Sequence, residues 1–204
     1  MRSMQWNVAW LVASCLAMTV ASANGADGDA APPVTDRFKA EAGDEVPSFQ
    51  RHISPLFGRL GCNGRACHGS FQGRGGFRLS LFGYDFKADM DSLLQKDHLR
   101  INREKPDESL ILVKPTNEDE HEGGKRYAKG SWEHHLIRRW IVGGAKFEEA
   151  KIEKIQSLEI TPAEILFNAS TDKASLKVVA HWADGSREDV TPLCRFVTNN
   201  DQIC

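Results

Sequence analysis

Neither sign of charge dominates this sequence of 204 residues, because 26 Lys and Arg stand against 28 Asp and Glu for a formal net charge of -2. Without a basic excess the chain has no field that would gather phosphates, which argues against nucleic acid or an anionic membrane surface as partners. The sequence also has no apolar run of about 20 residues, the length that a transmembrane helix needs. The hydrophobic share of 41% and charged share of 26% are instead typical of globular protein, with room for one ordinary or two small domains.

The N-terminal residues have the pattern of an export signal. Arg2 supplies the positive start, residues 8–20 form the apolar stretch, and Ala21–Ala23 is a small-residue cleavage site. We therefore expect residues 1–23 to be a signal peptide and the mature protein to be exported, to the periplasm or the cell surface. A lipoprotein box ending at Cys15 is the alternative, against which the apolar stretch continues past that cysteine.

The next part of the chain changes from a spacer pattern to a helical one. Residues 24–45 are rich in Ala, Gly, Asp and Pro without apolar periodicity, which predicts a flexible spacer. Apolar residues then recur at steps of three and four over 48–60, where Ser48 can cap a helix that ends at Gly61. Two further helices are predicted around 88–95 and 131–142. The segment 46–150 is thus expected to be a mainly helical domain.

From about residue 155 the apolar period changes from helical to extended. Residues 176–182 alternate between apolar and polar up to the turn Asp184–Gly185, which predicts a half-buried strand that enters a hairpin. Further short extended segments are predicted at 158–162, 164–168, 187–191 and 195–198. They suggest an all-β sandwich over 156–204, which we expect to be incomplete because about 100 residues are usual for an immunoglobulin-like sandwich.

Cys62, Cys67 and His68 carry the clearest chemical signal. In the haem c attachment pattern C-x-x-C-H, two thiols add to the porphyrin vinyl groups while the adjacent imidazole binds the iron. The spacing in this chain is C-x4-C-H. Two additional residues can bulge between the cysteines without moving Cys67 or His68. The alternative is a disulfide between Cys62 and Cys67, since an exported protein meets an oxidising compartment.

The chain resembles the cytochrome c-like domain of planctomycete cell-surface proteins, followed by a bacterial immunoglobulin-like domain of group 2. The resemblance implies a multidomain fold, in which a mainly α cytochrome c-like domain precedes a partial all-β immunoglobulin-like sandwich, and proteins of this kind usually continue into further domains. The segments that carry it are 48–57, 61–69, 75–85, 109–114, 121–126, 136–145, 182–186 and 189–191.

A cytochrome c iron also takes a sixth ligand, most often a Met sulfur from a loop before the last helix. The only Met after the signal is Met90, which lies between two aspartates in a predicted helix and is better explained as a packing residue. His121 is the stronger candidate, because it precedes both the flexible pair Gly123–Gly124 and the final helix. The alternative is that His121 belongs to a solvated acidic loop.

The other histidines and cysteines give weaker signals. His134 and His135 point about 100° apart on a helix, so they are interpreted as solvent-facing rather than as a metal pair. His52 and His98 have no Cys or carboxylate at ligand spacing, and His181 falls on the polar face of its strand. The spacing of Cys194 and Cys204 decides nothing about their pairing.

The sequence therefore predicts an exported, non-enzymatic electron-transfer module with one covalent haem c and an unidentified redox partner protein. We expect an apolar haem pocket built from both long helices and the segment between them, with the lining residues Phe57, Phe77, Leu79, Leu81, Trp132 and Trp140. Two alternatives remain open at this point. One is a haemless surface-binding module with a Cys62–Cys67 disulfide, and the other is a haem enzyme with an open sixth position.

Overall fold

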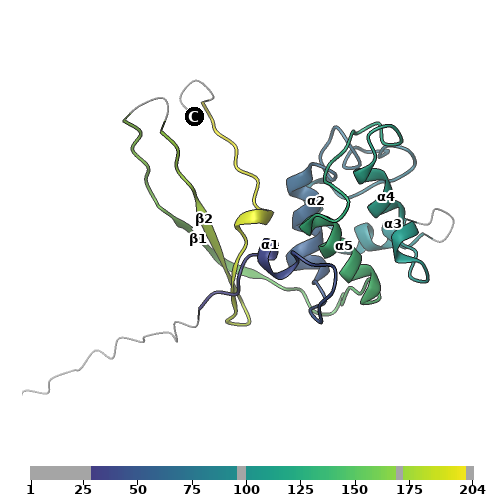
Figure 1. Cartoon of the computed structure of the whole chain (residues 1–204), viewed down its shortest axis with the longest axis horizontal. Coiled ribbons are helices and arrows are strands. Elements are labelled where there is room, and N and C mark those ends of the chain that lie inside the picture. The colour runs from purple at the N-terminus through teal and green to yellow at the C-terminus, as the bar shows by residue number, and fades with distance from the viewer. Residues whose placement is uncertain (1–28, 96–99, 169–171, 201–204) are drawn as a thin grey trace, which may run out of the picture.

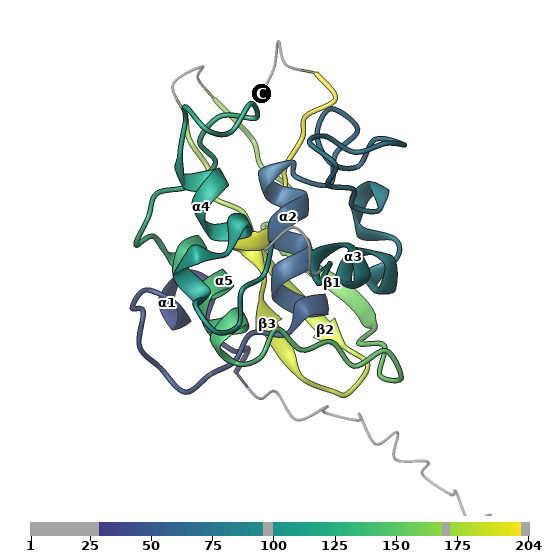
Figure 2. The same cartoon turned by 90° about the vertical axis from the view of Figure 1, so that its right-hand side faces the viewer.

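The computed structural model describes residues 29–95, 100–168 and 172–200. The elements are α1 (Val34–Arg37), α2 (Ser54–Leu60), α3 (Phe86–Leu93), α4 (Leu110–Thr116), α5 (Trp132–Val142), β1 (Ile155–Thr161), β2 (Lys177–Trp182) and β3 (Arg187–Asp189). Helices α2 to α5 gather at one end of the molecule, the strands project from the other, and α1 lies between them (Figure 1). The turned view places α2 in the middle of the helical part, with α3 on one side and α4 on the other (Figure 2). No helix within the described ranges is long and apolar enough to cross a membrane.

The first long helix begins and ends where the sequence predicts. The Ser48 hydroxyl accepts the N–H of Arg51 at 3.2 Å, and Gly61 ends the helix in a left-handed conformation with φ of 79°. Between these ends the winding changes, because a π-helical turn η1 (Phe49–Ile53) precedes α2. The change falls just before Pro55, which has no N–H to donate to a preceding carbonyl.

Helix α5 packs across this helix and forms the main core. The Trp140 ring lies 5.4 Å from that of Phe49 at 30°, in a stacked arrangement. Further fully buried aliphatic residues of this core come from both helices and from α3 and α4, among them Ile53, Leu56, Leu93, Leu112, Leu136, Ile137 and Ile141. The two long helices that the sequence predicts therefore pack against each other.

The C-terminal part is one antiparallel sheet with strand order β1-β2-β3. The predicted turn joins β2 to β3, with Gly185 at φ of 84°. Val178, Ala180 and Trp182 share one face of β2 and form a second, small core. The strands predicted at 164–168 and 195–198 are absent, and the chain after β3 enters a 3-10 turn η5 (Thr191–Leu193) at Pro192. Within the described ranges a second sheet is not formed, so the sandwich stays a prediction.

The prediction of a flexible spacer at 24–45 is wrong for its described residues, 29–45. Val34 and Phe38 are fully buried in the main core. Arg139 of α5 donates hydrogen bonds to carbonyl groups of this segment, including that of Ala40 at 2.8 Å. Two apolar residues four positions apart are enough to make one helical turn pack, although the composition around them is that of a linker.

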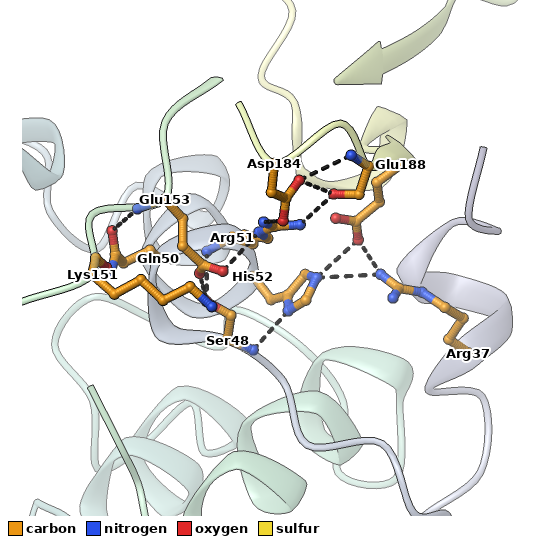
Figure 3. Close-up of polar contacts among 10 residues, drawn as sticks. Arg37, Ser48, Gln50, Arg51, His52, Lys151, Glu153, Asp184 and Glu188 are labelled. Carbon is orange, nitrogen blue, oxygen red and sulfur yellow. Dashed lines mark hydrogen bonds and ion pairs between the residues drawn. The ribbon is translucent and has the colours of Figure 1, made fainter. Parts of the chain in front are cut away.

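A buried cluster of charges joins the two parts of the molecule, as Figure 3 shows. Glu188 of β3 accepts hydrogen bonds from Arg37 of α1 and from Nε2 of His52, the latter at 2.8 Å. The other ring nitrogen of His52 accepts the Ser48 N–H at 2.9 Å. Burial raises the pKa of Glu188, but the hydrogen bond from His52 and the charge of Arg37 outweigh this effect and hold the net pKa below its ordinary value. We call Glu188, Arg37 and His52 the junction triad.

Arg51 makes a second bridge beside the junction triad (Figure 3). Its guanidinium lies 2.5 Å from a carboxylate oxygen of Asp184 and 3.0 Å from one of Glu153. The same group lies 4.4 Å from the ring of Trp182, in the small core of the sheet. These contacts fix the sheet against the first helix, so the two predicted domains pack together as one unit.

Candidate functional site

A cavity of about 260 Å³ lies where the end of α2, the loop after it, α4 and the loop before α5 meet. Its apolar wall includes Phe57, Phe77, Leu79 and Ile111, and Cys62, Cys67, His68 and His121 all line it. The structure therefore brings all four predicted site residues to one place. Since Cys62 and His121 lie far apart in the sequence, only the fold could unite them.

The loop between the cysteines accommodates its two additional residues as a compact turn. The Gly64 N–H donates to the Gly61 carbonyl at 3.1 Å, and the His68 N–H donates to the Cys62 carbonyl at 2.9 Å. A Cβ at Gly69 would lie 2.0 Å from the Asn63 carbonyl oxygen, so only glycine fits at this position. Despite the two additional residues, the hydrogen bond between the His68 N–H and the Cys62 carbonyl keeps the backbones of these two residues next to each other.

Both cysteines of the motif are unpaired thiols in this structure. Burial raises the pKa of Cys62 to about 11, against the smaller opposing effect of Arg126. A guanidinium nitrogen of Arg126 lies 3.8 Å from the Cys67 sulfur. Cys62 is therefore a neutral thiol at neutral pH, and it faces the same cavity as Cys67.

His68 is held in one tautomer by the backbone. Its Nδ1 lies 3.1 Å from the Phe77 carbonyl oxygen, and a carbonyl only accepts, so this hydrogen bond places the proton on Nδ1. In the neutral ring the lone pair then remains on Nε2. Burial lowers the pKa of His68, which favours the neutral imidazole that a metal requires.

His121, which also lines the cavity, has the same kind of backbone contact. Its Nδ1 lies 2.9 Å from the Gly124 carbonyl oxygen, so in the neutral tautomer that this bond favours the lone pair is on Nε2. Hydrogen bonds of this kind orient metal-binding histidines. The two rings lie 6.3 Å apart, centre to centre, with planes only 17° from parallel.

The separation of the two ring centres, taken alone, is that of two histidines that bind one metal. A histidine nitrogen lies about 2 Å from its metal and the ring centre about 1 Å further, so rings on opposite sides of one metal have centres about 6 Å apart. Among the described residues no group of three His, Cys, Asp or Glu is arranged to hold a bare ion. A haem iron needs only axial ligands from the protein. Two imidazoles and two thiols at one apolar cavity fit that group.

Gly123 gives the His121 ring its space. A Cβ at Gly123 would lie 2.9 Å from Cε1 of that ring. We expect Gly123→Ala to lower the free energy of unfolding by about 1–3 kcal/mol, because the ring or the loop must move. Urea unfolding followed by tryptophan fluorescence measures this change.

The control for that substitution is Gly58→Ala in α2. A Cβ at Gly58 would meet only Asn63, at 3.9 Å, so the helix should gain about 0.5–1 kcal/mol from the change. Equal effects of the two substitutions would contradict the steric role of Gly123.

The predicted pocket lining is half correct. Phe57, Phe77 and Leu79 line the cavity, whereas Leu81, Trp132 and Trp140 do not. The indole of Trp140 faces the main core instead, and that of Trp132 lies beside the guanidinium of Arg59 at 5.4 Å. Met90 of α3 is buried in the main core and lies outside the cavity lining, in agreement with its interpretation as a packing residue.

Sequence reasoning misplaced two histidines and missed two arginines. His134 and His135 are buried rather than solvent-facing, and Nδ1 of His135 lies 3.1 Å from the Phe38 carbonyl oxygen, in the segment predicted to be a spacer. Arg100 and Arg126 line the cavity without any local pattern that could have marked them. Half-buried His181 pairs with Glu159 at 3.2 Å on the sheet. The predictions for the signal peptide, His98 and Cys204 lie outside the described residues.

No known family model, curated protein or solved structure matches the chain. The resemblance to a cytochrome c-like domain therefore stays a prediction from the motif residues.

Proposed function

We propose that the chain is an exported c-type cytochrome module that holds one covalent haem and transfers electrons to or from another redox protein. The observation that carries this proposal is the arrangement of His68 and His121, with ring centres 6.3 Å apart at a cavity that Cys62 and Cys67 also line. With Nδ1 donating to a backbone carbonyl, each neutral imidazole would offer Nε2 to the iron.

Each of these four residues has a separate task in the proposal. Cys62 and Cys67 would anchor the porphyrin through thioethers, His68 would be the proximal ligand and His121 the distal one. When bound, the haem supplies an iron that takes up and releases one electron. Two imidazole ligands favour a lower reduction potential than a His and Met pair, while the apolar wall around Phe77 keeps water from the site.

A pyridine haemochrome assay tests the proposal directly. The chain is produced with a c-type maturation system, denatured and extracted with acidified acetone, so that only covalently bound haem stays with the protein. We expect a covalent haem band for the wild type, a shifted band for Cys62→Ala and for Cys67→Ala, each with one remaining thioether, and none for the double variant. Cys194→Ala, which alters the small core of the sheet, should retain the wild-type band.

The alternative hypothesis, a surface-binding module without haem, predicts the opposite result. Its wild type would carry no covalent haem, and its intact mass would be two hydrogens below that of the reduced chain because Cys62 and Cys67 would form a disulfide. That result would overturn the cytochrome proposal.

A further inference from the structure

Arg100 is a buried cation at the cavity with no carboxylate partner among the described residues. Its side chain lines the cavity, and the residue is only 4% exposed. Its guanidinium donates to three neutral oxygens, those of the Ser92 and Gly76 carbonyls and of the Gln95 side chain, at 2.7–3.1 Å. The charge is thus held firmly in place without being neutralised.

The position of Arg100 links it to the proximal ligand. Its guanidinium carbon lies 4.8 Å from the centre of the Phe77 ring, and the Phe77 ring lies 4.7 Å from that of His68. Glu120 and Glu122 line the same cavity but form no ion pair with Arg100. The acidic residues at the cavity therefore leave its charge uncompensated.

An uncompensated buried charge is costly, and desolvation lowers the pKa of Arg100 with no carboxylate to oppose it. A guanidinium is always charged in proteins, so the desolvation free energy cannot be lowered by loss of its proton. Its natural complement is a planar carboxylate, which binds the guanidinium fork with two hydrogen bonds. The missing counter-charge should therefore arrive with the ligand of the cavity.

We propose that Arg100 is the positioning residue that binds a carboxylate of the cofactor, a haem propionate, and by its fixed charge raises the reduction potential of the iron. This inference rests on the proposed function. Reduction adds one negative charge to the centre, so a nearby positive charge stabilises the reduced form. Loss of Arg100 would also leave the propionate charge unpaired, which favours the oxidised form.

Spectroelectrochemical titration of the haem-loaded full chain tests this assignment. We expect Arg100→Gln to shift the reduction equilibrium about tenfold toward the oxidised form, which for one electron is about 59 mV downward. Arg100→Lys keeps the charge and should stay close to the wild type. Arg78→Gln removes an exposed charge next to Phe77 but outside the cavity lining, and should leave the potential unchanged.

Each outcome decides the question. An unchanged potential in Arg100→Gln, with haem bound, overturns the role of Arg100 and leaves the proposed function standing. If Arg100→Gln fails to load haem while Arg100→Lys loads it, the charge is required and the assignment is supported. Failure of both variants to load would mean that Arg100 serves packing alone. A wild type without covalent haem would overturn the proposed function itself.

Discussion

Under the proposed function, replacement of His121 by alanine is expected to convert a six-coordinate low-spin haem into a five-coordinate high-spin one. The proposed attachment through His68 and both thioethers is unaffected by this change, so the amount of covalent haem should equal that of the wild type. The iron loses an imidazole that stabilises its oxidised form, and the reduction potential should rise. Visible absorption and electron paramagnetic resonance spectra of the purified protein measure the change of spin state.

The control for His121→Ala is His181→Ala, which removes a half-buried histidine of the sheet. Its spectrum should match that of the wild type. Should His121→Ala stay six-coordinate and low-spin, another residue would have to be the distal ligand. The parallel rings of His68 and His121 would then have a purely structural cause.

Replacement of Glu188 by alanine is expected to cost about 3–5 kcal/mol of unfolding free energy, the largest stability change that we predict. Glu188 is buried, and its removal leaves the Arg37 guanidinium beside His52 with the more exposed Glu45 as its remaining anionic partner. Urea unfolding followed by circular dichroism measures this loss. Glu159→Ala removes a carboxylate on the exposed side of the sheet, and should cost about 1 kcal/mol or less.

The same triad predicts a dependence of stability on pH. The folded pKa of Glu188 lies below its ordinary value of 4.5, so the unfolded chain takes up the proton first as the pH falls. The contribution of Glu188 is therefore complete above about pH 5 and is lost as the pH falls through the folded pKa. In Glu188→Gln this part of the acid sensitivity should disappear. An identical loss of stability below pH 5 in wild type and variant would contradict the coupling.

Local signals predicted the elements whose ends are encoded by neighbouring residues. Ser48 and Gly61 mark the ends of the first helix because capping and left-handed glycine need only nearby backbone. The turn at Gly185 follows in the same way from a short pattern. The candidate site could also be predicted from the sequence, since Cys62, Cys67 and His68 form one motif and the glycines after His121 indicate a tight loop.

The sequence could not show features that depend on distant partners. His52 pairs with Glu188, which lies 136 positions further along the chain. Arg100 looks like any surface arginine until the fold buries it at the cavity. The sequence predicts Trp140 in the pocket because it lies on the apolar face of the final helix. That face alone does not show which element packs against it.

The pairing of Ala31 with Glu188 has a consequence for the order in which the chain assembles. These residues form a parallel bridge, in which the Ala31 N–H donates to the Arg187 carbonyl at 2.9 Å. Contacts between residues so distant in sequence carry a high loop-closure entropy and form late. The segment around Ala31 is synthesised before β3, so this bridge cannot form until the end of the described chain has been made. The contact between the first and the last described parts of the chain is therefore among the last to form.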